Sequence, residues 1–317
     1  MKKLIALIIV LATLTLLCTS CSLFAPDTTT EIKIGVMNGP TGMGMAKLIN
    51  DEKSNPDTLY TFESYSAPTD AIPELTNGTL DMLCLPTNTA ATLSAKLDIS
   101  VIAINCLGSL YLMTDADTTV TSIADLEGKT IYCSVPTSTT QPIINYILKE
   151  AGVNATVECV SDHDALVAKI AKNEVSIAVL PEPKASAAMT KNSAYSVALN
   201  ISEEWNKVSD EPLTMGCIVV RNEFLENNKR AVDTFLTKYQ ASIEYINTKE
   251  NNETAAEMIT EAGIIPQAPI AKKALNNLYG SIVYMDGADM KNALVSFYNA
   301  IGQELPDESF YYSNKWF

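Results

Sequence analysis

Arginine and histidine are scarce in this chain. Its 317 residues include Arg221, Arg230 and a single histidine, His163. Two separate arginines form no cluster for a phosphate or a dicarboxylate. One histidine means that a Ser-His-Asp triad could be built only around His163. That residue lies in the sequence Ser-Asp-His-Asp, which predicts a helix start on the surface, so we favour a solvated or capping role over a catalytic one.

Metal-binding motifs are also missing from the sequence. No cluster of His, Cys and carboxylate residues has the spacing of a zinc site, and we expect neither a metal nor another cofactor. The formal net charge is −15, which argues against nucleic acid or an anionic lipid surface as a partner. After the N-terminal segment there is no second apolar run of membrane length. The usual parts of a hydrolase, a metalloenzyme and a nucleic-acid-binding protein are therefore absent from the sequence.

Cysteines are present, but their pattern is not informative. Five follow the N-terminal segment, and four of these lie inside apolar runs. Their number is odd and no pair has metal spacing. We predict buried free thiols, with a disulfide as an open alternative whose pairing the sequence does not define. The five are Cys84, Cys106, Cys133, Cys159 and Cys217.

The N-terminus has the pattern of an export signal. A short basic segment precedes the apolar run 4–17, which is too short to span a membrane comfortably, and two small residues then precede Cys21. We predict a signal peptide over residues 1–20. The cleavage site resembles a bacterial lipobox, so we predict lipidation of Cys21 and a polar tether over 21–30, with ordinary secretion as the alternative.

A strand, a glycine-rich turn and a helix follow one another between Ile32 and Asn50. Apolar residues alternate through Met37, a turn with one proline and three glycines covers 38–44, and helical spacing begins after it. The free N–H groups and the dipole at such a helix start suit the acceptor end of a small ligand. The turn lacks the residues of a P-loop and the spacing of a dinucleotide fingerprint. A tight turn that needs glycine only for steric reasons is the alternative.

The same design recurs along the chain. Buried strands at 80–85, 130–135 and 175–180 each run into a proline-containing turn and then a helix, and from Phe224 onward we expect mostly helix. Strands alternating with helices predict an α/β fold of two doubly wound lobes, with a ligand cleft at the carboxyl ends of their strands. We expect Glu182 either to accept a hydrogen bond from the ligand or to cap the next helix. The predicted ligand-binding residues are Asn38, Gly39, Pro40, Thr41, Met43, Ser66, Pro86, Thr87, Asn88, Pro136, Thr137, Ser138, Thr139, Thr140 and Glu182.

Four segments together resemble a known family. They are Ala71–Leu85, Ile123–Val135, Ile170–Ala188 and Thr214–Tyr245. In order and spacing they are similar to the solute-binding proteins of ABC importers, in the two-lobed periplasmic type II class and its nitrate, taurine, alkanesulfonate and thiamine-pyrimidine branch. The arginine that often grips a ligand carboxylate in this family and the cysteine-rich motif of its thiamine-pyrimidine members are not found.

The resemblance implies a domain plan and a function. The chain would cross between lobes near Met113 and near Leu213, giving lobe one as 31–114 plus 214–317 and lobe two as 115–213. It implies an extracytoplasmic, lipid-anchored protein without catalytic residues that delivers a small oxyanion, a sulfonate or a heteroaromatic ligand to a permease and its ATPase. The alternatives are an enzyme on the same fold, similar to those of menaquinone synthesis, and a sensory or adhesion ectodomain.

Overall fold

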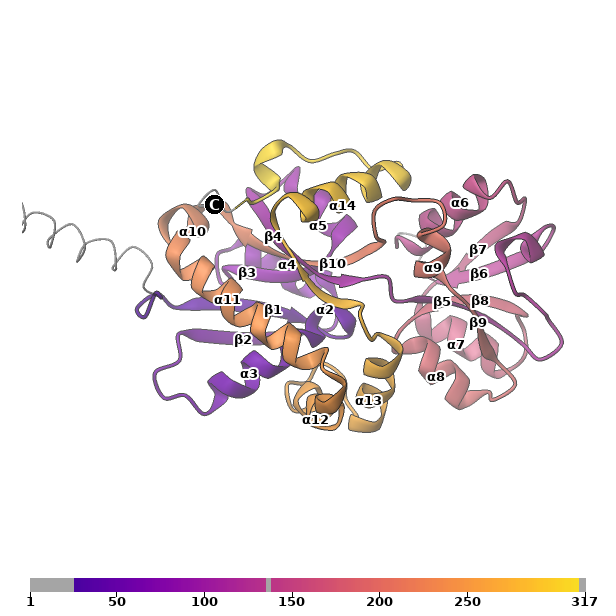
Figure 1. Cartoon of the computed structure of the whole chain (residues 1–317), viewed down its shortest axis with the longest axis horizontal. Helices are drawn as coiled ribbons and strands as arrows, with labels where there is room; N and C mark the ends of the chain where they lie inside the picture. The colour runs from indigo at the N-terminus through magenta and orange to yellow at the C-terminus, as the bar shows by residue number, and fades with distance from the viewer. Residues whose placement is uncertain (1–25, 135–137, 314–317) are drawn as a thin grey trace, which may run out of the picture.

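The computed structural model describes residues 26–134 and 138–313. The predicted signal peptide, the predicted lipidation site Cys21, and Pro136 and Thr137 lie outside the described residues. The described strands form two separate sheets, one of six strands and one of five. The two sheets and their helices lie side by side along the long axis of the molecule (Figure 1). The prediction of two doubly wound α/β lobes is confirmed.

The first sheet has the strand order β11-β4-β10-β3-β1-β2. Its strands β3 and β4 are almost completely buried, as expected where helices cover both faces of a sheet. β10 runs antiparallel to β3 and β4, which flank it, whereas β1, β2 and β3 pair in parallel. The strands are β1 (Ile32–Met37), β2 (Tyr60–Tyr65), β3 (Met82–Pro86), β4 (Ile99–Leu107), β10 (Thr214–Arg221) and β11 (Ile282–Met285).

Helices pack on both faces of the first sheet. One face is covered by α4, α5 and α14, whose buried residues belong to one apolar core, and the other by α3, α11, α12 and α13, which belong to another. The helices of this lobe are α2 (Pro40–Met43), α3 (Ala46–Lys53), α4 (Pro68–Thr76), α5 (Thr87–Ser94), α10 (Asn222–Asn227), α11 (Lys229–Ile246), α12 (Asn252–Glu261), α13 (Ala268–Asn277) and α14 (Gly287–Ala300), with the short 3-10 helices η2 (Lys249–Asn251) and η3 (Glu308–Phe310).

The second sheet has the strand order β7-β6-β8-β5-β9. Its strands are β5 (Leu110–Thr114), β6 (Thr130–Ser134), β7 (Thr156–Val160), β8 (Ile177–Pro181) and β9 (Ser196–Asn200), and its helices are η1 (Ile123–Leu126), α6 (Thr140–Glu150), α7 (His163–Ala171), α8 (Lys184–Lys191) and α9 (Ile201–Trp205). β5 pairs with β8 along its whole length and with β9 from Tyr111 to Thr114. The chain therefore leaves the first sheet at Gly108 and Ser109, and the crossing predicted near Met113 was placed a few residues too late.

Three short strands differ from the sequence predictions. β5 was assigned to lobe one, β9 was not identified, and β11 fell within the tail that was predicted to be mostly helical. β11 lies at the edge of the first sheet and pairs only with β4. Four residues at a sheet edge give too short a pattern for periodicity to separate them from the helices on either side. We use lobe one below for 32–107 plus 214–313 and lobe two for 110–205.

The prediction of free thiols holds for three cysteines and is wrong for two. Cys84, Cys106 and Cys217 are free and buried, whereas Cys133 and Cys159 form a disulfide. The two bonded residues are register partners on the neighbouring parallel strands β6 and β7. Their Cα atoms are 4.6 Å apart, within the usual range for a disulfide. The sequence could not reveal this pairing because it depends on the register between the two strands.

Within 26–134 and 138–313, no helix combines the length and the apolar character needed to cross a membrane.

Candidate functional site

The carboxyl ends of the strands in the two sheets point toward one another. β4 ends at Leu107 and β5 begins at Leu110, so only two residues separate the sheets at this crossing. β1 and β3 run parallel to β4 and therefore end at the same edge as β4. In the second sheet Leu110 pairs with Pro181, the last residue of β8, which places the carboxyl ends of β6 and β8 beside the start of β5. We call these the lobe-one edge and the lobe-two edge.

The turn after β1 forms one part of the lobe-one edge. Gly39 has a φ of 91°, a value that favours glycine, and its N–H donates to the carbonyl of Ile264. At Gly42 a Cβ atom would lie 2.0 Å from the carbonyl oxygen of Met37, so the start of α2 can approach β1 only with glycine there. Pro40 is the first residue of α2, where its fixed φ suits a helix start. The glycines are therefore required sterically, whether or not a ligand binds here.

Two predicted ligand residues meet beside this turn. The side-chain amide of exposed Asn38 donates to the hydroxyl of Ser66, at 3.0 Å, and Ser66 follows β2. Thr41 is half-buried in α2. Met43 is completely buried in the core between the first sheet and α11, so its side chain supports α2 from inside the lobe.

The turn after β3 continues the lobe-one edge. Pro86 ends β3, and fully buried Thr87 donates from its hydroxyl to the carbonyl of Thr214, at 3.3 Å. Thr87 thereby ties α5 to the start of β10, so its side chain has a structural partner. Asn88 is half-buried in the first turn of α5, and its carbonyl accepts from Gln303 at 2.9 Å.

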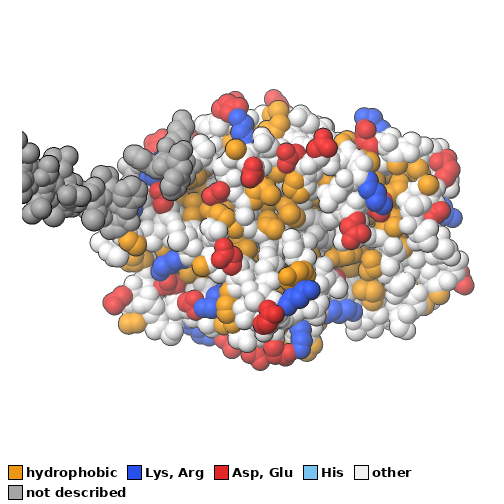
Figure 2. All heavy atoms as spheres, in the orientation of Figure 1, with side chains coloured by type: hydrophobic (Ala, Val, Ile, Leu, Met, Phe, Trp, Pro, Cys, Tyr) orange, Lys and Arg blue, Asp and Glu red, His pale blue; other side chains and the backbone are white. Residues whose placement is uncertain are grey.

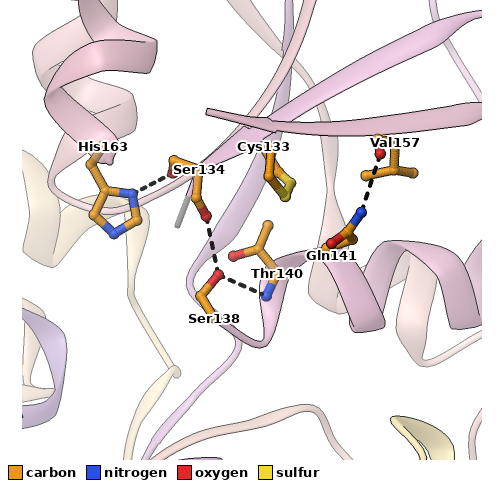
Figure 3. The surroundings of a disulfide bond; sticks show 8 residues. Cys133, Ser134, Ser138, Thr140, Gln141, Val157 and His163 are labelled. Atoms are coloured by element: carbon orange, nitrogen blue, oxygen red, sulfur yellow. Dashed lines mark hydrogen bonds between the residues drawn. A yellow bond between two sulfur atoms is a disulfide. The ribbon is translucent and has the colours of Figure 1, made fainter. Parts of the chain in front are cut away.

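Hydroxyl groups dominate the lobe-two edge at the start of α6. Ser138 donates from its hydroxyl to the carbonyl of Ser134, at 3.1 Å, and accepts from the N–H of Thr140, at 3.4 Å (Figure 3). Thr139 precedes the helix and is 9% exposed, and Thr140 is buried. The disulfide lies directly beside this network, because Cys133 precedes Ser134 at the end of β6 (Figure 3).

His163 belongs to the same edge, which the sequence did not predict. It is the first residue of α7 and half-buried, and its Nδ1 lies 2.5 Å from the hydroxyl oxygen of Ser134 (Figure 3). Burial, and then the nearby charge of Lys184, lower the pKa of His163 from its ordinary value. The capping role falls instead to Asp162, whose carboxylate accepts from the N–H of Ala165. His163 is therefore a half-buried imidazole with a lowered pKa, bonded to a fully buried serine.

Glu182 joins the two lobes. Its carboxylate is 2% exposed and accepts from the hydroxyl of Ser186, at 3.0 Å, and from the side-chain amide of Asn277, at 2.5 Å. Asn277 ends α13 of lobe one, and its carbonyl also accepts from the hydroxyl of Tyr111, at 2.6 Å. The N–H of Glu182 donates to Ser109, in the crossing itself. Of the two roles we predicted, the 3.4 Å bond from the N–H of Ser186 to the carboxylate fits capping of α8, and the bond to lobe one is an addition.

Acidic residues outnumber basic ones, and the formal net charge is −15. On the face that Figure 2 shows, the acidic and basic side chains of the described residues are interspersed. Among 26–134 and 138–313, no group of His, Cys, Asp and Glu has the arrangement of a metal site. The polar groups at the two edges are mainly hydroxyls, amides and backbone N–H groups, which suit hydrogen bonding to a small molecule.

Two α/β lobes with opposed carboxyl edges define the type II periplasmic-binding-protein fold, and comparison with solved structures shows it. A protein from Parabacteroides distasonis described as an ABC transporter has a TM-score of 0.74 at 19% identity, covering 91% of this chain and 100% of that chain. The periplasmic aliphatic sulphonate-binding protein of Escherichia coli has a TM-score of 0.69 at 15% identity, covering 88% and 95%. The periplasmic nitrate-binding protein of Synechocystis has a TM-score of 0.56 at 16% identity, covering 74% and 66%.

A family model described as menaquinone biosynthesis matches residues 59–303, and the chain belongs to this family. A search by sequence against curated proteins gives no match. The solved structures therefore confirm the fold that was predicted from the resemblance. The family to which the chain belongs is the one whose model is described as menaquinone biosynthesis.

Proposed function

We propose that this chain is the extracytoplasmic, lipid-anchored solute-binding component of an ABC importer, and that it captures a small molecule between its lobes. The observation that carries the proposal is the pair of opposed edges, each ending in polar turns and joined at a crossing of two residues. A ligand between the edges contacts both lobes only when they approach, so binding favours the closed arrangement in proportion to its differential affinity. A permease can then recognise closure as occupancy.

The cysteines support the extracytoplasmic location. A disulfide between Cys133 and Cys159 persists in an oxidising compartment and is rare in the cytosol. Cys21 follows an apolar segment of signal-peptide length, at the position that a lipobox assigns to the lipidated residue.

The proposed ligand contacts come from both edges. In lobe one they are Thr41 and Asn88, together with Asn38 and Ser66 beside the turn after β1. In lobe two they are Ser138 and Thr139, and Thr137, which is next to them in sequence. The ligand classes that such donors suit are a small oxyanion, a sulfonate or a heteroaromatic molecule. The proteins of similar fold that are described as binding sulphonate and nitrate belong to the first two classes.

An enzyme is the second candidate, and two observations favour it. The family is described by a biosynthetic pathway, and the imidazole of His163 lies at the lobe-two edge next to Ser134. Ser134 is fully buried, however, so it is not placed to attack a ligand as a nucleophile. The imidazole would have to act alone as a general base. We therefore propose binding without turnover.

The anchor is tested by fractionation of cells that produce the full chain. We expect wild-type protein in the membrane fraction and the Cys21→Ala variant in the soluble fraction. Cys18→Ala is the matched control, because it removes a thiol from the same segment and should remain membrane-bound. Soluble wild-type protein, or a membrane-bound Cys21→Ala variant, would contradict lipidation at Cys21.

Turnover is tested with the molecule that the protein carries. Protein purified from its host is unfolded in urea, and the small molecule released is identified by mass spectrometry. This molecule is then incubated in excess with refolded protein, and we expect it to be recovered unchanged. Conversion of more than one equivalent, abolished by His163→Gln, would replace the binding function with an enzymatic one.

A further inference from the structure

Two buried hydrogen bonds hold the first residue of α5 from inside lobe one. The hydroxyl of Tyr298, on α14, donates to the carbonyl of Thr87 at 3.0 Å, and the hydroxyl of Thr87 donates to the carbonyl of Thr214 at 3.3 Å. Thr87 and Tyr298 are both 0% exposed. Burial raises the pKa of Tyr298 well above its ordinary value, so its hydroxyl keeps the proton that it donates. Thr87 is therefore fixed to two other elements of the lobe.

The second of these bonds ends where the chain returns from lobe two. The segment between α9 and β10 is the second crossing between the lobes, and Thr214 is the first residue after it. Thr214 pairs with Leu107, the last residue before the first crossing. A Cβ atom at Gly108, in the first crossing, would lie 3.2 Å from Cδ2 of Leu213, so the two crossings lie side by side. Thr87 thereby connects the start of α5 to the point at which the lobes are joined.

Asn88, the next residue, carries the amide that we proposed as a ligand contact. Its carbonyl accepts from the side-chain amide of Gln303 at 2.9 Å, and also from the hydroxyl of Thr92, at 3.0 Å. Gln303 follows α14, the helix that carries Tyr298. The first turn of α5 is thus held by α14, by the residues after α14 and by β10. A shift of this turn relative to the crossings would break hydrogen bonds that water cannot replace at fully buried Thr87.

We propose that Thr87 and Tyr298 are positioning residues for the ligand, because they hold Asn88 at a fixed place relative to the crossings. Both are completely buried, so they act through Asn88 rather than by touching the ligand. This inference rests on the proposed binding function. A contact that is already in place costs less conformational entropy when the ligand binds. Loss of either bond lets the first turn of α5 move, and ligand affinity then falls because Asn88 is no longer aligned.

The first test removes the hydroxyl of Thr87. The probe is the molecule that wild-type protein releases in urea, and affinities are measured by calorimetry with refolded protein. Thr87→Val keeps the branched shape and loses the donor, so it should weaken binding about threefold or more, whereas Thr87→Ser keeps the donor and should bind within about twofold of the wild type. Equal affinities for the wild type and Thr87→Val would overturn the inference and leave the binding function intact. If wild-type protein carries no small molecule, the binding function fails, and this inference fails with it.

A double-mutant cycle separates the positioning of Asn88 from a general structural role. In the Asn88→Ala background the aligned amide is absent, so adding Thr87→Val should have almost no further effect on affinity. The same substitution should still lower the unfolding midpoint of the ligand-free protein, because the buried hydrogen bond is lost. If the two substitutions weaken binding additively, Thr87 does not act through Asn88 and the inference is overturned. An Asn88→Ala variant that binds like the wild type would overturn it as well.

Tyr298→Phe tests the other bond, and Tyr195→Phe is its matched control. Tyr195 is also buried, and its hydroxyl donates to the carbonyl of Val175, which precedes β8 and therefore lies at the opposite end of that strand from the lobe-two edge. Both variants should lower the unfolding midpoint, and only Tyr298→Phe should weaken binding, again by about threefold or more. Equal losses of affinity would show that lower stability alone is responsible. Wild-type affinity in Tyr298→Phe would likewise contradict the positioning role.

Discussion

Asn277 forms a polar junction between the two lobes. Its amide donates to the buried carboxylate of Glu182 at 2.5 Å and lies 3.2 Å from the hydroxyl oxygen of Ser186, while its carbonyl accepts from Tyr111. A buried carboxylate needs such donors, since water does not reach it. The junction therefore holds the end of α13 against the start of α8 before any ligand is considered.

Removing this amide should weaken the junction. We expect Asn277→Ala to lower the free energy of unfolding by about 1–3 kcal/mol, because Glu182 then loses a donor while it stays buried. Urea denaturation measures the effect. Asn276→Ala is the matched control, because its exposed side chain contacts Asn252 within lobe one, and we expect a change below about 0.5 kcal/mol. Equal stability of the two variants would show that the junction contributes nothing.

The sequence could not predict Asn277 or the pair of Ser134 and His163. Proline and glycine marked the turns, so Asn38 and Ser66 were selected from the sequence and are in contact. Asn277, by contrast, is the last residue of a helix and has no such marker, and its partner is 95 residues away.

The disulfide connects two neighbouring elements of lobe two. Cys133 on β6 and Cys159 on β7 are 26 residues apart in sequence, and α6 lies between the two strands. Closing this loop in the unfolded chain removes conformational entropy from it, which stabilises the folded lobe.

Loss of the disulfide should therefore destabilise the protein. We expect Cys133→Ser with Cys159→Ser to lower the free energy of unfolding by about 3 kcal/mol, and dithiothreitol to lower that of the wild type by a similar amount. The double variant should not respond to dithiothreitol, which serves as the control. A wild type whose urea midpoint is unaffected by complete reduction would contradict the prediction.

Buried apolar strands were predictable, whereas the sheet to which β5 belongs was not. β3, β4 and β10 are apolar along most of their length, because helices cover both faces of their sheet. β5 continues from β4 after two residues, so its sequence alone does not show that it belongs to the other sheet. The pairing of β5 with β8 and β9 shows which sheet it belongs to. Such pairing joins residues that are far apart in the sequence.

At the scale of the whole molecule, the proposed function requires closure around the ligand. We expect saturation with the molecule released from wild-type protein to lower the radius of gyration measured by small-angle scattering. Thr139→Val should cost about 0.5–1.5 kcal/mol of binding free energy, as should Asn88→Ala. Thr237→Val, an exposed position on α11, is the control and should bind normally. An unchanged radius together with unchanged affinities would place the ligand elsewhere.

The central position of β10 has a consequence for how the protein matures. β3 and β4 leave the ribosome early, yet the strand that pairs with both of them follows only after all of lobe two. Until β10 is synthesised, β3 and β4 each expose the edge that later pairs with β10. Exposed strand edges of this kind can pair with other chains. Lobe two is one continuous segment and can complete its sheet first. We therefore expect lobe two to become native while lobe one still depends on chaperone protection.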